Sequence, residues 1–369
     1  MITRLGDVAT YINGYAFKPS DWSNEGKPII RIQDLTDNSY QMNRFNGRIP
    51  EKYYVKKGDV LISWSASLGV YRWTGEDAVL NQHIFKVVFD KTEVDKEFFI
   101  IQAEKILKDA QTQTHGATMK HLTKPMFDSL RFYYPPLAEQ REIVMKMGAV
   151  RRSIEKRKAQ LKKLDDLVKS QFIEMFGDPV ENEKSWDVVK LSEIAEFFNG
   201  LTYRPEDVGA GTIVLRSSNI QDGELDFSDI VRVRTNIRER LFVRTGDLLM
   251  CSRNGSAKLV GKVAPIGALN EPMTFGAFMM IIRSSMPEYL MTYFRTEAFR
   301  EQIKTGATTT INQITATMLN KVRLPLPPTQ LVNQYALFVK QTDKSKFRIK
   351  QSLEKLETLY KALLQKYFG

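Results

Sequence analysis

Cysteine and histidine are scarce in this sequence of 369 residues. The one cysteine is Cys251, so no disulfide bond can form within the chain, and a reducing compartment is its natural setting. Histidine occurs three times, and no cysteine lies near His115 or His121 in the sequence. A cysteine–histidine metal site is therefore not expected. We expect this chain to hold no metal and no cofactor of its own.

Long apolar runs are also missing. The central apolar run, Phe275–Ile282, is far shorter than the roughly 20 residues that a membrane-spanning helix needs. The first residues, Met1–Tyr11, lack the apolar stretch of a secretion signal. Apolar residues nevertheless make up 43% of the sequence, which suffices for the cores of about two domains. We expect a soluble chain that works in the cytoplasm.

Sequence motifs of catalytic sites are absent. A methyltransferase that acts on adenine amino groups needs an Asp or Asn before a Pro pair, but the Pro pairs here follow Tyr134 and Leu326. The glycine-rich stretch Gly209–Gly211 precedes an expected strand, whereas a dinucleotide-binding loop follows one. The sequence also lacks a Walker-type phosphate loop and the clustered acids of a nuclease. We therefore expect no catalytic residue and no activity of the chain alone.

Positive charge is in excess and unevenly distributed. The chain has 54 Lys and Arg against 43 Asp and Glu, a net charge of +11, which favours nucleic acid or another polyanion as a partner. Residues 138–176 carry ten basic and six acidic side chains, and residues 330–368 carry eight and three. These two segments hold most of the excess, because the rest of the sequence is nearly neutral.

The sequence repeats itself. Leu5–Trp22 matches Leu191–Val208 at an offset of 186 residues, and Leu161–Gly177 matches Leu353–Gly369 at an offset of 192. The sequence is therefore two tandem copies of one unit, a globular module followed by a helix. We place the modules at residues 1–137 and 178–329 and the helices at 138–177 and 330–369.

Two long helices are expected after the modules. Each Pro pair is followed by about forty residues without proline, and each of these segments ends in Phe-Gly, a common helix stop. Apolar residues recur at heptad spacing along both segments. These expected seam residues are Ile154, Leu161, Leu164, Val168 and Met175 in the first helix and Ile349, Leu353, Leu356, Tyr360, Leu363 and Tyr367 in the second.

The order of the copies favours pairing of the two helices as an antiparallel coiled coil, which would give the molecule pseudo-twofold symmetry. The alternative is that each helix packs separately on its own module. At 1.5 Å per residue, a helix of this length spans roughly 58 Å. Either arrangement therefore contains two rods that are longer than the helices of a small domain.

The modules themselves are expected to be α+β. Short apolar runs alternate with Gly, Asp and Asn turns, which indicates a twisted, mostly antiparallel sheet. The expected strands cover residues 28–32, 60–63, 85–89, 212–215, 247–251 and 278–282. A helix over residues 96–108 has an expected counterpart over residues 287–304.

This order of module, Pro pair and heptad helix, written twice, resembles the specificity subunit of type I restriction-modification enzymes. The Asn-Gly and Pro motifs at Asn13–Pro19 and Asn199–Pro205 and the Gly-Asp turns before strands also resemble its target recognition domains. The resemblance spans essentially the whole chain. A departure is Thr329–Gln334, which replaces the Leu137–Glu142 of the first copy, so the two helix starts are expected to present different surfaces.

The resemblance implies a non-catalytic reader of double-stranded DNA, in which each module reads one half of a split, asymmetric target. It implies that the helices set the spacer and dock two methyltransferase subunits, which use S-adenosylmethionine. Restriction subunits, which translocate and cleave DNA, would join through the methyltransferases where the system has them. The alternative is a coiled-coil regulator or adaptor that binds DNA without an enzyme.

Residues suited to base and phosphate contact lie on the expected loops. In the first module they are Lys18, Arg31, Gln33, Ser63, Trp64, Ser65, Tyr71, Arg72, His83, His115, Thr118, Lys120, His121 and Lys124. In the second module they are Arg204, Arg216, Ser217, Asn219, Arg253, Asn254, Ser256, Lys258, Thr308, Thr310 and Asn312. Purely structural alternatives exist, such as strand-end turns for Arg31 and Arg216 and a core position for Trp64.

Overall fold

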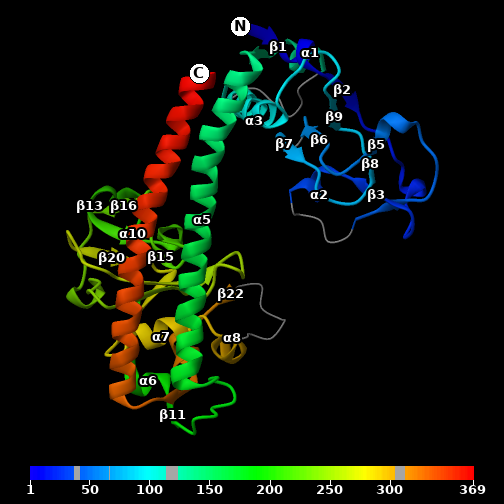
Figure 1. Ribbon diagram of the computed structural model, residues 1–369. Helices are drawn as coiled ribbons and strands as arrows, with labels where there is room; N and C mark the ends of the chain where they lie inside the picture. The colour runs from blue at the N-terminus through cyan, green and yellow to red at the C-terminus, as the bar shows by residue number, and fades with distance from the viewer. Residues whose placement is uncertain (37–41, 66, 114–123, 304–311) are drawn as a thin grey trace. The chain divides into compact units, whose positions relative to one another are not determined.

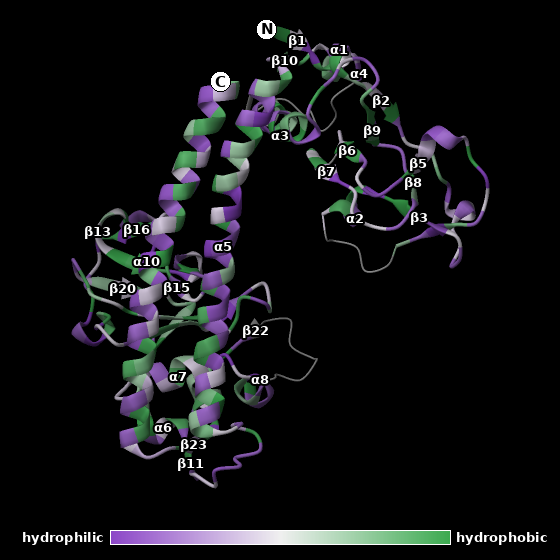
Figure 2. Ribbon diagram, in the orientation of Figure 1, coloured by the Kyte–Doolittle hydropathy of each residue, from purple (hydrophilic) through white to green (hydrophobic). Residues whose placement is uncertain are grey.

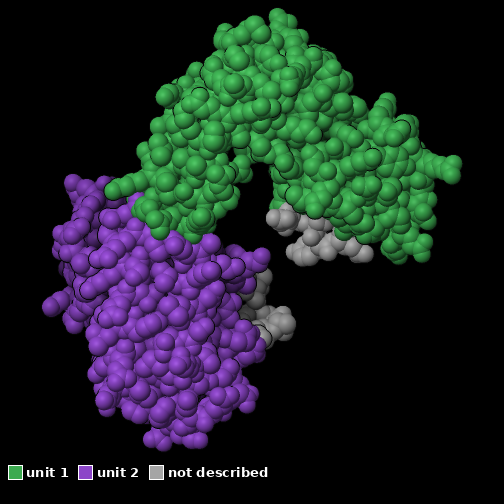
Figure 3. All heavy atoms as spheres, in the orientation of Figure 1, with its two compact units in different colours: residues 1–158, 352–369 green, residues 159–351 purple. Residues whose placement is uncertain are grey.

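The computed structural model describes residues 1–36, 42–65, 67–113, 124–303 and 312–369 (Figure 1). The chain divides into two compact units (Figure 3). Unit 1 consists of Met1–Lys158 and Ser352–Gly369, and unit 2 consists of Ala159–Gln351. Each unit contains one globular module and a part of each long helix. The division into four domains that the sequence suggested stays a prediction.

The described part of unit 1 contains two four-stranded sheets. The antiparallel sheet β2-β9-β6-β7 consists of β2 (Thr10–Asn13), β9 (Ile84–Val88), β6 (Val60–Ser63) and β7 (Gly69–Arg72). The sheet β4-β3-β8-β5 consists of β4 (Arg44–Phe45), β3 (Lys27–Ile30), β8 (Ala78–Leu80) and β5 (Tyr54–Val55). A separate ladder joins β1 (Ile2–Arg4) to β10 (Arg131–Tyr133). The helices are α1 (Leu5–Val8), α2 (Ile32–Leu35), α3 (Lys96–Gln113) and α4 (Lys124–Ser129), with 3-10 turns at Pro19–Asp21 and Glu51–Tyr53.

Strand β6 lies between two hydrophobic cores, which explains its uninterrupted apolar sequence. Val60 and Ile62 pack into a core that includes Phe98 of α3. Leu61 points the other way, into a core that includes Ile30 of the second sheet. Because side chains alternate between the two faces of a strand, a strand that is covered on both faces needs an apolar residue at every position.

Unit 2 repeats this architecture. Its sheet β12-β21-β17-β19 consists of β12 (Ala195–Asn199), β21 (Met279–Ser284), β17 (Leu248–Cys251) and β19 (Val263–Pro265). Its sheet β16-β13-β20 consists of β16 (Val231–Val233), β13 (Val208–Leu215) and β20 (Met273–Phe275). The two-stranded ladders join β14 (Ile220–Gln221) to β15 (Glu224–Leu225), β18 (Arg253–Asn254) to β22 (Asn312–Gln313), and β11 (Asp187–Lys190) to β23 (Arg323–Leu326). The helices are α6 (Leu191–Ile194), α7 (Pro287–Tyr293), α8 (Glu297–Ile303) and α9 (Ala316–Leu319), with 3-10 turns at Pro205–Asp207, Ser217–Asn219 and Glu239–Leu241.

Strand β17 occupies the place that β6 has in unit 1. Leu248 and Met250 pack into one core, and Leu249 and Cys251 pack into another. The strand order β12-β21-β17-β19 likewise reproduces β2-β9-β6-β7. The mixed helix and strand fold expected from the sequence is confirmed at this level.

One pair of strands in each module is parallel, which the sequence did not reveal. Strand β3 pairs with β8 in parallel, and β13 pairs with β20 in the same way. The residues that pair in parallel, Ile29–Ile30 with Val79–Leu80 and Ile213–Leu215 with Met273–Phe275, are few and mostly apolar, so their sequences carry no mark of strand direction. The other described strand pairs are antiparallel, as expected.

The two long helices are confirmed. They are α5 (Leu137–Phe176) and α10 (Thr329–Phe368), and hydrophilic and hydrophobic residues alternate along both (Figure 2). Helix α5 ends as its sequence suggested, because Gly177 has φ +79° and its N–H donates to the carbonyl of Ile173 at 2.8 Å.

The expected seam residues are all partly buried, and none is fully buried. The fully buried residues of the two helices lie closer to their ends, where the modules cover them. In unit 1 these include Ile143 and Met147, and in unit 2 they include Phe172, Phe176, Val332 and Tyr335. The heptad pattern therefore identified the stripe but not the positions with the greatest burial.

The helix expected over residues 287–304 is two helices, α7 and α8. Thr296 causes the break, because its hydroxyl donates to the carbonyl of Tyr293 at 2.7 Å and accepts from the N–H of Phe299 at 3.4 Å. The same hydroxyl therefore closes one helix and caps the next. No helix formed by the described residues is both long and apolar enough to cross a membrane.

Candidate nucleic-acid interface

Four segments of unit 1 meet at one end of its sheets. These are Asn13–Tyr15, Arg31, Trp64 and Asn81–His83, which we name the loop cluster of unit 1. The N–H of Tyr15 donates to Leu80 at 2.7 Å, and the N–H of Gln82 donates to Tyr15 at 2.9 Å. Trp64 joins the cluster through its N–H, 3.3 Å from the carbonyl of His83, and through its indole N–H, 3.2 Å from Oδ1 of Asn13.

The corresponding segments of unit 2 meet in the same way. They are Asn199–Leu201, Arg216–Ser217, Ser252–Asn254 and Gly276–Phe278, which we name the loop cluster of unit 2. The N–H of Leu201 donates to Phe275 at 2.7 Å, and the N–H of Ser252 donates to Phe278 at 2.9 Å. The amide of Asn254 lies 3.4 Å from the hydroxyl of Ser217. The structure therefore brings together candidates that are far apart in the sequence.

A glycine is needed at one point of each cluster. A Cβ atom added to Gly14 would lie 1.9 Å from the carbonyl oxygen of Asn81, and one added to Gly200 would lie 2.0 Å from that of Gly276. The chain crosses too closely there for any side chain. This approach gives the Asn-Gly dipeptides at Asn13 and Asn199 a structural reason.

Arg31 and Arg216 occupy equivalent places but differ in their partners. The guanidinium of Arg31 lies 3.4 Å from Asp34 and 5.9 Å from the centre of the Trp22 ring. That of Arg216 lies 2.7 Å from Asp229. Both also form the strand-end turn that was the structural alternative, since the backbone N–H of each donates to the side chain three residues later, Asp34 in one case and Asn219 in the other. The turn and a contact with DNA are compatible, and the contact stays a prediction.

Trp64 is a partly buried aromatic residue at the edge of the core. Its ring stacks on Phe85 at 5.6 Å and lies 5.1 Å from the ring of His83. His83 has φ +74°, which turns the chain sharply at this point. One face of the Trp64 ring therefore packs against the core, which was the structural alternative for this residue.

Arg253 and Asn254 lie on β18 in the loop cluster of unit 2. The Arg253 guanidinium stacks over the ring of Phe278 at 5.4 Å. The carboxamide oxygen of Asn254 accepts from the N–H of Ser256 at 3.0 Å, which shapes the turn. Strand β22 pairs with β18 so that Asn312 faces Asn254 across the ladder.

Other candidates are committed to local contacts. Lys18 and Arg204 start equivalent 3-10 turns, Arg72 pairs with Glu97, and Lys124 pairs with Asp128 at 2.6 Å. Ser63, Ser65 and Asn219 are buried, Tyr71 is partly buried, and Gln33, Ser256 and Lys258 are exposed. His115, Thr118, Lys120, His121, Thr308 and Thr310 lie outside the described residues.

Sequence reasoning missed two exposed aromatic residues of the clusters. Tyr15 is 36% exposed and Phe278 is 58% exposed. Phe278 corresponds to His83 in the second copy. The N–H of Gly14 donates to Ile84, the residue after His83, and the N–H of Gly200 donates to Met279, the residue after Phe278. An alignment of the two copies over this loop would have shown that Phe278 occupies the place of the candidate residue His83.

Buried polar atoms without a partner concentrate in and beside the clusters. Within the described residues six buried side-chain atoms lack a hydrogen bond, and four of them belong to Asp34, His83, Arg216 and Ser218. Such atoms are costly inside a folded protein unless a ligand or water satisfies them. No cluster of three or more potential metal ligands occurs among the described residues. The polar side chains of the loop clusters that are partly exposed, such as Arg31, Arg216 and Arg253, suit a ligand rich in hydrogen-bonding groups.

Comparison with known proteins finds a family model that matches part of this chain. Residues 1–164 match the family model "Type I restriction modification DNA specificity domain". The match covers the module of unit 1 and residues 137–164 of α5.

The whole chain is similar to type I specificity subunits. It is 26% identical to the EcoBI specificity subunit of Escherichia coli over 317 residues, which are 77% of this chain and 65% of that subunit. It is 22% identical to the EcoKI specificity subunit of Escherichia coli strain K12, over 100% of this chain and 88% of that subunit. The MjaVIII specificity subunit of Methanocaldococcus jannaschii is also 22% identical, over 88% of this chain and 82% of that subunit.

Solved structures of specificity subunits share the fold. The S subunit of a type I restriction-modification system from M. genitalium matches with a TM-score of 0.56 and 14% identity, over 100% of this chain and 96% of that one. A chain from a study of assembly and conformational transition of the type I system matches with a TM-score of 0.56 and 19% identity, over 100% and 97%. The resemblance found in the sequence is thus supported by family, relatives and fold.

Proposed function

We propose that this chain is the DNA sequence-recognition subunit of a type I restriction-modification complex and has no catalytic site of its own. The observation that carries the proposal is the pair of loop clusters, where unlike polar and aromatic residues occupy equivalent places. Base edges supply the donors and acceptors that such a surface needs. The similarity to specificity subunits along the full length supports the same role.

Each loop cluster would read one half of a bipartite target. Trp64 and His83 in unit 1 correspond to Ser252 and Phe278 in unit 2, since each pair is joined by the same backbone hydrogen bond. Different side chains at equivalent places recognise different bases. Two unlike readers in one chain therefore favour an asymmetric target.

The proposal includes antiparallel pairing of α5 and α10, and contacts in unit 1 support it. Lys146 of α5 interacts with Tyr367 of α10, and Lys158 of α5 lies 3.2 Å from Glu357 of α10. The residue number in α10 falls as the number in α5 rises. This is the relation that antiparallel helices require.

Contacts in unit 2 support the same direction. Asp165 of α5 lies 2.7 Å from Lys346 of α10, and the hydroxyl of Tyr335 in α10 donates to the carbonyl of Val168 in α5 at 3.3 Å. The partner number again falls along α5. A pair of helices with 40 residues each would measure about 60 Å, which exceeds the ~34 Å between half-sites one DNA turn apart.

The helices would also dock two methyltransferase subunits, which use S-adenosylmethionine, and through them restriction subunits. Met145 and Leu337, which correspond at an offset of 192 residues, are 67% and 63% exposed. Large apolar side chains at equivalent exposed places suit two copies of one partner. The charge of the helices is less available than the sequence suggested, because Lys158 and Lys350 pair with Glu357 and Glu224.

The two helix starts differ for a reason of packing. Gln140 is fully buried, with its carbonyl oxygen 2.9 Å from the N–H of Asp95 and its amide 2.8 Å from the carbonyl of Pro135. The corresponding residue in the second copy is Val332, which is buried in an apolar core beside Met286. The sequence departure at this point therefore replaces a polar pair by an apolar pair inside the molecule, and both helices can still present similar outer surfaces.

Co-purification tests the proposal. The chain should form a stable complex with two methyltransferase subunits per chain, and the complex should methylate adenine in specific DNA while neither component does so alone. Mass measurement of the complex gives the stoichiometry. A free chain that binds a specific sequence with full affinity, with no gain from the methyltransferase, would favour the stand-alone regulator instead.

A further inference from the structure

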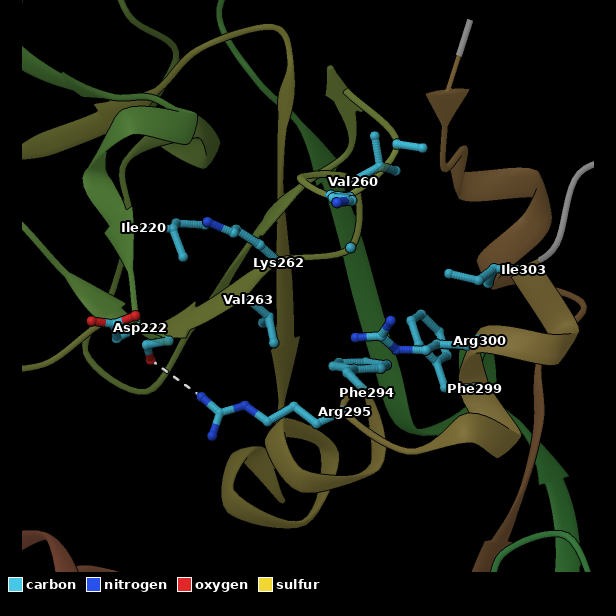
Figure 4. Close-up of a pocket in the computed structure, with 14 residues that line it drawn as sticks. Ile220, Asp222, Val260, Lys262, Val263, Phe294, Arg295, Phe299, Arg300 and Ile303 are labelled. Carbon is cyan, nitrogen blue, oxygen red and sulfur yellow. Dashed lines mark hydrogen bonds between the residues drawn. The ribbon is translucent and has the colours of Figure 1, made fainter. Parts of the chain in front are cut away.

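A cavity of about 320 Å³ opens in unit 2. Its apolar floor includes Val263, Phe294 and Phe299, and the two phenylalanines are only 3% and 1% exposed. Figure 4 shows the side chains of Lys262, Arg295 and Arg300 arriving from different elements around it. With Lys258, four cationic residues line the cavity, and Asp222 is the one acidic residue among the described lining residues.

Most of this positive charge is uncompensated within the chain. In the part of the chain that the structure describes, Lys258, Lys262 and Arg300 make no side-chain ion pair or hydrogen bond. Arg295 donates to the carbonyl of Gly223 at 3.3 Å, as Figure 4 shows. The excess of Lys258, Lys262 and Arg300 over the single lining acid, Asp222, therefore makes the cavity attractive to anions.

Unit 1 has no equivalent of this arrangement among its described residues. Residues 252–262 connect β17 to β19, whereas only residues 64–68 connect β6 to β7, so the loop that carries Lys258 is longer in unit 2. The position of Arg295 corresponds to Glu104 in α3, eight residues after the start of its helix region in both copies. The charge is thus reversed at this position, which points to a property of unit 2 alone.

We propose that this cavity binds a phosphate group, as part of a phosphate ester. Lysine and arginine form charge-assisted hydrogen bonds with phosphate oxygens, and the planar arginine fork matches them in pairs. The volume exceeds that of a phosphate alone and leaves room for a sugar against the apolar floor. The ester is supplied by the DNA backbone or by a small phosphorylated molecule, and only the first source rests on the proposed function.

Acidic groups near the cavity interact with Arg295, so the other cationic residues are expected to contribute most to phosphate binding. Asp165, Glu224 and Asp343 all act on Arg295, whereas desolvation by its surroundings lowers the pKa of its guanidinium. Arg295 is therefore held in place by its own surroundings. Lys262 and Arg300 have no such partners, so they are the residues to change.

The first test is titration of the full chain with inorganic phosphate by calorimetry, at constant ionic strength in chloride. The double variant Lys262→Gln/Arg300→Gln should bind phosphate at least about tenfold more weakly than the wild type. Lys321→Gln is the matched control, an exposed lysine of unit 2 that does not line the cavity, and it should bind as the wild type does. Equal thermal midpoints for the three proteins would show that the double variant is folded.

The second test identifies the source of the phosphate. Binding to a duplex of arbitrary sequence is measured over a range of salt concentrations, and the slope of log affinity against log salt should fall by about 0.9 for each backbone phosphate lost in the double variant. A lower slope assigns the cavity to the DNA backbone. Weaker phosphate binding with an unchanged slope assigns it to a small phosphorylated ligand.

Unchanged phosphate binding together with an unchanged slope would overturn the inference. Failure of the proposed function gives a different result: a chain that binds no DNA would still lose phosphate affinity in the double variant. Because the duplex has an arbitrary sequence, the outcome also does not depend on sequence recognition.

Discussion

Asp247 and Asp59 belong to the Gly-Asp turn that both copies contain, but their carboxylates differ in burial and in their ion-pair partners. The Asp247 carboxylate accepts from the N–H of Arg244 at 2.8 Å and from two guanidinium nitrogens of Arg283, both at 2.7 Å, and Asp247 is 2% exposed. The hydrogen bond with Asp247 also raises the pKa of Arg283. Asp59 in unit 1 caps the same turn, but its partner is Lys86 at 3.2 Å, and its side chain is 27% exposed.

Replacing these two aspartates should therefore have unequal effects. Asp247→Ala leaves the Arg283 guanidinium without its partner, and we expect a loss of about 3–5 kcal/mol of stability in unit 2. Asp59→Ala should cost unit 1 about 1 kcal/mol, because the Lys86 pair is partly solvated. Hydrogen exchange of β17 and β6 measures each unit separately.

Arg283→Lys is the matched control, since it keeps a cation beside Asp247 but removes the contact through two guanidinium nitrogens. It should cost less than Asp247→Ala. A larger loss from Asp59→Ala than from Asp247→Ala would contradict the role of burial in this motif.

Cys251 offers a probe of the same strand. The thiol is 1% exposed, and desolvation raises its pKa, so two effects slow its reaction with alkylating reagents. We expect labelling of the native chain at pH 8 to be at least about a hundredfold slower than labelling in denaturant. The rate, followed by mass spectrometry, reports the opening of β17. Equal rates in the two conditions would show that this part of the core is not closed.

At the scale of elements, the hydrophobic pattern predicted the strands and helices whose formation depends on nearby residues. The strands at Val60–Ser63 and Leu248–Cys251 and the two long helices were expected because apolar runs, proline positions and Phe-Gly stops depend on nearby residues. The parallel pairing of β3 with β8 was not predictable, because strand direction depends on contacts between distant segments.

The sequence likewise suggested some, but not all, of the residues that form the loop clusters. Loop segments such as Arg31 and Ser252–Asn254 were chosen for their side chains, and the structure brings several of them together. Tyr15 and Phe278 were missed, since an aromatic residue near a strand is more often part of a core. Asn219 was chosen as a base contact, yet the residue is 2% exposed and its amide donates to the carbonyls of Asp226 and Asp229. Whether each of these side chains is exposed depends on the fold, which the local sequence does not reveal.

Tyr335 joins three helices of unit 2. It is fully buried, its hydroxyl lies 2.8 Å from that of Thr292 in α7, and it also donates to Val168 in α5. Its ring lies 5.2 Å from the ring of Phe176. We expect Tyr335→Ala to cost about 3–5 kcal/mol and Tyr335→Phe about 1–2 kcal/mol, measured by chemical denaturation.

The pH dependence of the Phe variant checks this account. Burial raises the pKa of Tyr335 from 10.0 to about 12, so its contribution is complete below pH 10 and is lost as the pH rises from 10 through 12. Tyr335→Phe removes this loss, so its stability should fall less steeply than that of the wild type above pH 10. Parallel curves for the two proteins would mean that the hydroxyl is solvated.

At the scale of the whole molecule, duplication explains why one chain carries two unlike loop clusters on the same scaffold. The modules share strand order and the close approach at Gly14 and Gly200, so the scaffold is the same. The side chains at the loop clusters and the charge at Glu104 and Arg295 differ. A scaffold that is repeated while its surface varies suits recognition of two different half-sites.

Changes in one loop cluster should alter one half of the target only. We expect the pair of substitutions Trp64→Ala and His83→Ala to relax or change base preference in one half-site and to leave the other half-site and the spacer as they were. The control is Leu167→Ala, an exposed residue of α5, which should leave both half-sites unchanged. Selection from a randomised DNA library, with the methyltransferase present, measures all three quantities. Changes in both halves would contradict independent reading.

Mapping of methylated adenines across the genome of a host that expresses this chain with its methyltransferase partner tests the central claim most directly. The account predicts one non-palindromic motif in two parts, separated by a spacer of fixed length. A continuous motif, a palindrome, or a spacer that varies from site to site would contradict it.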